Sequence, residues 1–246
     1  MQAPTVENVF ARAWDLLTKN WIIIVPGIVV GFVVGIISGE FSLTQPDTYG
    51  DPSGAAMSFA YGAGAFVTNL VLAVIAIAGY IITQCYTAGM AGAAWRSGTT
   101  TLSDGSRAVH DDAGNVLVAG IYLLLVGIVA LVLAPFTFLL SLFAFYLFTL
   151  YTIASAVVGN HPGGSALRES FAIARARFGT TLIVGIVLGV LQLFGRLIAH
   201  FFAFAPLLGP IIAAIIAQVV VAYAVLVVVG EYLVLRPGVS EPVPPL

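Results

Sequence analysis

Long stretches of this chain carry no charge. From Val116 to Val158 there is no Asp, Glu, Lys or Arg. Only 8% of the 246 residues are charged, whereas a typical soluble domain carries about 25%. A water-soluble surface of this size cannot be covered with so few charges, and the mean hydropathy of +1.07 agrees. We therefore expect an integral membrane protein that contacts the lipid bilayer.

The chain offers six candidate membrane spans, because a spanning helix needs about 20 mostly apolar residues. They are residues 21–39, 64–95, 116–134, 136–158, 180–202 and 207–235. Pro135 marks a tight hairpin between the third and fourth spans. The runs are apolar on every face, unlike the alternating strands of a membrane barrel, so we predict an all-α polytopic fold. Residues 1–236 form one domain, and the proline-rich residues 237–246 form a flexible tail.

The basic residues favour one orientation of these spans. One side of the predicted membrane receives eight of them: Arg12, Lys19, Arg96, Arg107, Arg168, Arg175, Arg177 and Arg236. The other side receives Arg196, and the loop over residues 40–63 contains acidic residues but no basic ones. Because Lys and Arg concentrate in cytoplasmic segments, we expect both termini to lie in the cytoplasm.

The segments before the first, third and fifth spans resemble one another. Phe10, Trp14 and Trp21 share one helical face in the first segment, and Phe171 and Phe178 do so in the third. Such faces are typical of amphipathic helices that lie along the lipid headgroups. Residues 13–21 align with residues 170–178 without a gap, whereas residues 103–115 are more polar and indicate a solvated helix or loop. We predict an internal repeat of three units, each an interfacial helix and a transmembrane hairpin; the alternative is that any amphipathic helix before a span looks similar.

The six-span layout, the segment Ala166–Phe171 and the similar plan from Val9 to Trp21 resemble a known bacterial membrane domain. That domain occurs alone or fused to some glycerophosphodiester phosphodiesterases. The resemblance implies the fold and a location in the bacterial cytoplasmic (inner) membrane. It does not extend to the phosphodiesterase domain, so it implies no such activity, and stand-alone members are mostly of unknown function.

Glycines four residues apart predict close helix packing. They are Gly27, Gly31, Gly35 and Gly39 in the first span, and Gly185 and Gly189 in the fifth. Small residues at this spacing, as in a glycine zipper, let a second helix approach closely. The second helix belongs to this chain or to another subunit, and we expect this chain.

A few polar side chains inside the spans are candidates for a site. Gln192, Arg196 and His200 share one face of the fifth span near its outer end. They either face a cavity or another subunit, or extend to the headgroups as long polar side chains do. Glu231, near the inner end of the last span, is expected to pair with Arg96 or Arg177.

Recognised catalytic, metal-binding and phosphate-binding motifs are missing from the sequence. We therefore predict no catalytic residue, metal site or cofactor, and the net charge of −2 argues against nucleic-acid binding. The preferred interpretation is a non-enzymatic scaffold or accessory subunit that binds other membrane protein subunits. A small transporter or channel is the alternative, and a membrane-embedded enzyme of lipid metabolism is the third interpretation.

Overall fold

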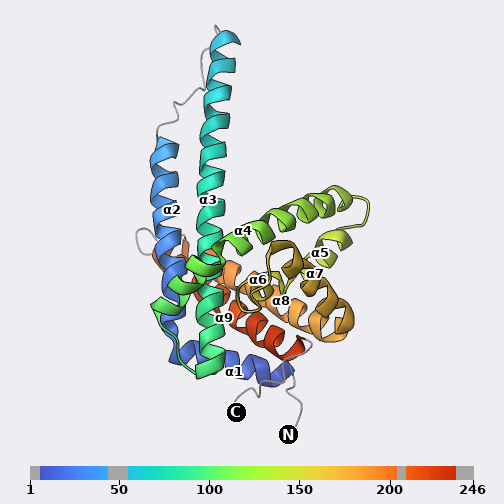
Figure 1. Cartoon of the computed structure of the whole chain (residues 1–246). Coiled ribbons are helices and arrows are strands. Elements are labelled where there is room, and N and C mark those ends of the chain that lie inside the picture. The colour runs from blue at the N-terminus through green and yellow to red at the C-terminus, as the bar shows by residue number, and fades with distance from the viewer. Residues whose placement is uncertain (1–5, 44–54, 204–208, 237–246) are drawn as a thin grey trace.

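The computed structural model describes residues 6–43, 55–203 and 209–236, and all regular secondary structure in these ranges is helical (Figure 1). Five segments are long and apolar enough to cross a membrane: Val74–Ser97, Leu102–Leu133, Leu140–Val157, Phe178–Phe202 and Ile211–Leu235. A sixth is obtained if Val6–Lys19 and Trp21–Val34, which meet at 88°, count as one span. The predicted all-α fold of a polytopic membrane protein is confirmed.

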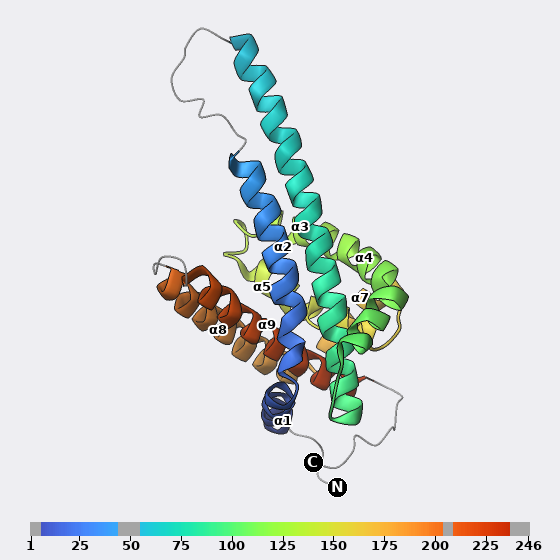
Figure 2. The same ribbon diagram turned by 90° about the vertical axis from the view of Figure 1, so that its left-hand side faces the viewer.

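The helices form three hairpins that share one end and diverge from it (Figures 1 and 2). The hairpins are α2 (Val25–Leu43) with α3 (Ala55–Ser97), α4 (Leu102–Leu133) with α5 (Leu140–Thr149), and α8 (Phe178–Ala203) with α9 (Gly209–Leu235). A 3₁₀ turn, Trp21–Ile24, precedes α2. We call the shared end the base: it contains α1 (Val6–Lys19), α6 (Thr152–Val157), α7 (Gly163–Ala176), the start of α4 and the ends of α3 and α9.

The buried core lies mostly in the base, where α1, α3, α4, α6, α7 and α9 meet. Ala13 of α1, Met90 of α3 and Tyr232 of α9 are all fully buried there. The hairpins instead expose large apolar side chains, such as Leu124 and Val129 of α4. Apolar surfaces of this extent are stable only against lipid or another apolar partner, which explains why they lie on the parts that leave the base.

Several helices differ in extent from the predicted spans. The segment predicted as the 40–63 loop contributes the end of α2 and the start of α3, because residues 55–63 are small or apolar and contain no proline. Residues 44–54 and the predicted tail, 237–246, lie outside the described residues. Pro135 lies in a turn over residues 134–139, where Phe138 and Leu139 have positive φ angles of 50° and 67°.

The fourth predicted span is broken between α5 and α6. The buried side chain of Ser170, from α7, compensates for the break: its hydroxyl donates to Phe148 O at 2.8 Å and accepts from Tyr151 N at 3.1 Å. Backbone groups released by a helix break need such partners when water is excluded. The interruption is therefore stabilised from a neighbouring helix.

The first and third units share their local structure. Asn20, which ends α1, has φ −123° and ψ 50°, and Arg177, which ends α7, has φ −127° and ψ 46°. Each donates its backbone N–H to the carbonyl four residues earlier at 2.9 Å. The buried positions of the two helices also coincide under the gapless alignment: Val9 with Ala166, Ala13 with Ser170, Leu16 with Ile173, and Leu17 with Ala174. Duplication of one unit predicts this correspondence.

The middle unit differs, because residues 103–115 form the first part of α4 and continue without a break to Leu133. Thr101 and Asp104 start this helix with a reciprocal cap in which Thr101 N donates to Asp104 Oδ2 at 2.8 Å. No proline interrupts the sequence between Thr101 and Leu133. The middle unit therefore has no separate interfacial helix in the part of the chain that the structure describes.

The Asn20 side chain fixes α1 to the turn between α3 and α4. Its Nδ2 donates to Leu16 O at 3.0 Å and to Gly98 O at 3.1 Å, and its Oδ1 accepts from Thr100 N at 2.9 Å. Gly98 ends α3 with a φ of +80°, a conformation that glycine adopts without strain. A single buried amide thus satisfies backbone groups from two distant segments.

Candidate functional site

The predicted polar face of the fifth span lies on α8, toward the end away from the base. Gln192 is half-buried, whereas Arg196 and His200 are exposed. Arg196 makes no hydrogen bond or ion pair with any other described residue. Its neighbours Leu193, Phe194, Leu197 and Ile198 are also exposed, so the guanidinium lies on an otherwise apolar surface.

Glu231 does not belong to that face. The helices α8 and α9 run antiparallel, so Glu231 lies in the base, far along α9 from the end that adjoins Arg196. The predicted pairing of Glu231 with Arg96 or Arg177 is wrong, because no arginine nitrogen lies within 4.0 Å of its carboxylate in the described structure. Arg96 instead donates to Val158 O at 3.4 Å, and Arg177 is exposed. Glu231 is 2% exposed, and its Oε1 has no hydrogen-bond partner among the described residues.

Only some of the glycines predicted to mediate helix packing contact another helix of the described chain. A Cβ at Gly27 would collide with Gln218 of α9, and one at Gly185 would collide with Leu147 of α5. Gly31 and Gly189 have no neighbour within 4 Å of such a Cβ, so they do not contact another helix of the described chain. Gly35 and Gly39 belong to α2, but their surroundings lie outside the described residues.

A close contact between α8 and α9 occurs at a glycine that the four-residue spacing did not single out. A Cβ at Gly195 would lie 2.7 Å from Val220 Cγ2. Gly189 and Gly195 are six residues apart, so they point to different sides of the helix. Gly195 packs inside the hairpin, and Gly189 leaves an open notch on the outer surface.

The predicted interfacial aromatics remain accessible at the base. Trp14 and Trp21 are 56% and 65% exposed, and Phe171 and Phe178 are also exposed. Phe10 is half-buried and, with Trp14, surrounds Tyr223 of α9, whose hydroxyl donates to Phe10 O at 3.1 Å. The helix α1 thus buries one side against α9, while Trp14 and, just after the helix, Trp21 stay more than half exposed, an arrangement suited to a membrane interface.

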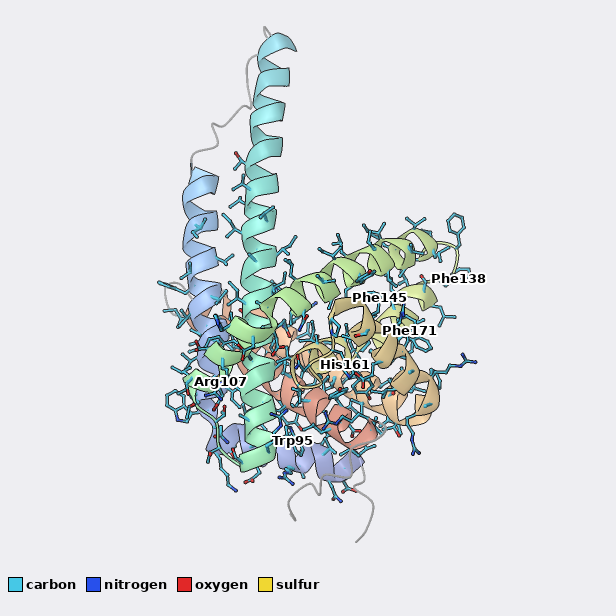
Figure 3. All side chains as sticks on the ribbon, in the orientation of Figure 1. Trp95, Arg107, Phe138, Phe145, His161 and Phe171 are labelled. Atoms are coloured by element: carbon cyan, nitrogen blue, oxygen red, sulfur yellow. The ribbon has the colours of Figure 1, made fainter. Side chains whose placement is uncertain are left out.

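A partly buried polar cluster around Glu169 is the feature that the sequence did not indicate: Ser155 and Tyr232 are fully buried, whereas the side chains of Glu169 and His161 are 18% and 44% exposed. Glu169 Oε2 accepts hydrogen bonds from Ser155 Oγ and, at 3.1 Å, from Tyr232 OH. His161 Nε2 lies 3.2 Å from the same oxygen (His161 is labelled in Figure 3). These donors come from α6, α9 and the loop before α7, so one carboxylate connects three parts of the base.

The Glu169 cluster holds parts of the base together and does not have the arrangement of a catalytic site. A Cβ at Gly159 would collide with Tyr232 OH, so the loop can approach α9 only because it has a glycine there. In a catalytic relay the serine would contact the histidine, and the histidine would contact the carboxylate. Here Ser155 and His161 both contact the Glu169 carboxylate, and no hydrogen bond joins their two side chains to each other. No group of three or more metal-ligating side chains occurs among the described residues.

The comparisons add no relative to this picture. No protein-family model, curated protein or solved structure matches this chain. The resemblance to the bacterial membrane domain therefore stays a prediction from the sequence pattern. The features that bear on function are therefore the exposed side of α8 around Arg196 and the polar groups of the base.

Proposed function

We propose that this protein is a non-enzymatic accessory or scaffold subunit of a larger membrane assembly. In this proposal it lies in the bacterial cytoplasmic membrane with its base and both termini in the cytoplasm. The observation that carries the proposal is the open face of α8, which we define as Gly189, Gln192, Leu193 and Arg196. This face combines a notch, an amide and a guanidinium on a surface that is otherwise apolar.

The physical argument rests on the position of Arg196. An arginine in contact with hydrocarbon is unfavourable by about 2.5 kcal/mol or more, so such residues face other protein groups or reach the headgroups. Gly189 lies seven residues before Arg196, on the same face, and lets a second helix come close. A transmembrane helix of another subunit, with a carboxylate or amide opposite Arg196, would satisfy both features at once.

A photo-crosslinking experiment in native membranes tests this proposal. A photoreactive amino acid is introduced at Leu193 or, as a control, at Val129 of α4; both side chains are 58% exposed. We expect a discrete protein adduct from Leu193 and only lipid adducts from Val129. Gly189→Leu should abolish the adduct, whereas Gly114→Leu, at another glycine with no neighbour within 4 Å, should preserve it. Equal crosslinking at both sites, or an adduct that survives Gly189→Leu, would refute the proposal.

A small transporter is the second candidate function, and Glu231 is the observation that favours it. A carboxyl group buried in a membrane protein is unfavourable unless it is neutral or paired, and such groups often bind transported ions or protons. Proton flux into proteoliposomes should then fall in Glu231→Gln and remain unchanged in the exposed Arg175→Gln. Absence of flux in the wild-type protein would remove this candidate.

A further inference from the structure

A polar groove of about 350 Å³ lies in the base between α3 and α4. Most residues of the α3 wall are small, among them Gly89 and Gly92, and Arg96 is its one long side chain. The α4 wall contributes Arg107 and Asp111, and the end of α6 closes the groove with apolar side chains. Figure 3 labels Arg107 on the part of α4 beside α3. The two glycines let α3 pack closely, since a Cβ at Gly89 would collide with Ala108 of α4 and one at Gly92 would lie 3.0 Å from Val158 Cγ2.

The charged side chains of the groove form no ion pair within 4.0 Å of one another, although Arg107 lies near enough to Asp104 to attract its carboxylate. Two arginines and three aspartates line it, yet the ion pairs within 4.0 Å in the described structure are Lys19–Asp15 and His161–Glu169, both outside the groove. Asp104 is already engaged, since its Oδ2 accepts from the backbone and hydroxyl of Thr101. Arg107 and Asp111 form no hydrogen bond with another described residue, so both can bind a ligand.

We propose that this groove binds a phosphate ester that also carries an ammonium group, with phosphoethanolamine as the simplest example. Guanidinium groups form paired, charge-assisted hydrogen bonds with phosphate, so Arg96 and Arg107 suit the phosphate. The carboxylates of Asp111 and Asp112 suit the ammonium. A simple anion would face these carboxylates and a simple cation would face the arginines, so a ligand with both charges matches best. The volume lies in the range of small-molecule sites.

The ligand has two possible sources. Asp112 lies four residues before Val116, where the apolar part of α4 begins, so the headgroup of a phosphatidylethanolamine molecule can reach the groove from the membrane. A soluble phosphoethanolamine offers the same groups. This inference does not depend on the open face of α8, and the two can fail separately.

Binding of defined probes to the purified full-length protein tests the inference. Phosphatidylethanolamine, phosphatidylglycerol and soluble phosphoethanolamine are each titrated in mild detergent, and bound species are counted by native mass spectrometry. We expect phosphatidylethanolamine to bind more tightly than phosphatidylglycerol. Arg107→Gln and Asp111→Asn should each weaken binding by about tenfold, because each removes a charge-assisted hydrogen bond. Arg175→Gln on α7, an exposed arginine outside the groove, is the matched control.

The pattern of loss distinguishes the outcomes. If soluble phosphoethanolamine binds and both variants lose it, while the lipid does not bind, the chemistry is supported and the source is the cytosol. If Arg107→Gln weakens binding and Asp111→Asn does not, the groove is a simple anion site and the proposal is wrong. Measurable and equal affinities for the two lipids, or variants that bind like the wild type, would also overturn it. Thermal unfolding of each variant shows whether it is folded.

Discussion

Replacing Asn20 with leucine should loosen the whole base. The side chain is 5% exposed and connects the end of α1 to the turn between α3 and α4. Leucine has the same branched shape and the same number of side-chain heavy atoms, and its methyl groups are bulkier than the amide, so the substitution removes hydrogen bonds without leaving a cavity. Leu16 O keeps the backbone N–H of residue 20 as a donor, whereas Gly98 O and Thr100 N lose the amide.

The expected loss of stability follows from Gly98 O and Thr100 N, which are left without the amide as a hydrogen-bond partner. Thr100 N is buried and Gly98 O is partly buried; a buried backbone group without a partner costs about 1–3 kcal/mol, so the pair costs about 2–6 kcal/mol. Burial of the leucine side chain offsets about 1–2 kcal/mol of this loss. The net decrease in the free energy of unfolding is about 2–3 kcal/mol. For a chain of this size that corresponds to a melting temperature lower by about 5–10 °C.

Intrinsic tryptophan fluorescence can follow the unfolding of the base. The chain has three tryptophans, and all of them lie in the base: Trp14 in α1, Trp21 directly after Asn20, and the buried Trp95 near the end of α3. Thermal unfolding in mild detergent, followed by tryptophan emission, therefore reports on the base. Lys19→Ala is the control, since its ion pair with Asp15 is exposed and contributes less than about 1 kcal/mol. The reasoning is refuted if Asn20→Leu melts together with Lys19→Ala.

Four further substitutions, in three experiments, test other contacts of the base. Gly230→Val should lower stability by about 2 kcal/mol and shift the emission of Trp95 to longer wavelength, because the new side chain would collide with the buried indole. A double-mutant cycle of Glu169→Gln and Tyr232→Phe should give a coupling energy of about 1–2 kcal/mol in thermal unfolding; additive effects would mean that their hydrogen bond is not stabilising. Gly98→Ala should cost about 1 kcal/mol, measured in the same way, because its φ of +80° is strained for alanine. An unchanged melting temperature would contradict that reasoning.

Hydropathy was a good guide to the fold because transfer into lipid depends on local composition alone. The long apolar run from Val116 to Val158 required a turn, and Pro135 lies within that turn in the structure. The alignment of residues 13–21 with residues 170–178 pairs Asn20 with Arg177, and these two residues have nearly the same backbone angles in the structure. The break between α5 and α6 was not predictable, since it depends on a serine from another helix.

The polar groups of the base were harder to predict for the same reason. Glu169 lies off the apolar face of its helix, so the sequence pattern predicts that it is exposed to solvent. Its partners Ser155 and Tyr232 lie 14 and 63 residues away in the chain, and nothing in the local pattern connects them. Likewise, the spacing of Gly185 and Gly189 placed them near one face, but only the packing shows that one contacts α5 and the other is open.

We propose that the base and the far ends of the hairpins lie on opposite sides of one membrane, with the base inside the cell. Labelling of single cysteines with a membrane-impermeant maleimide tests it directly, in a Cys85→Ala background that removes the one native, buried cysteine. Lys19→Cys reports on the base, and Asp51→Cys reports on the segment between α2 and α3. We predict that Asp51→Cys is labelled in intact cells and Lys19→Cys only in inverted membrane vesicles. Labelling of both positions from the same side would contradict the account.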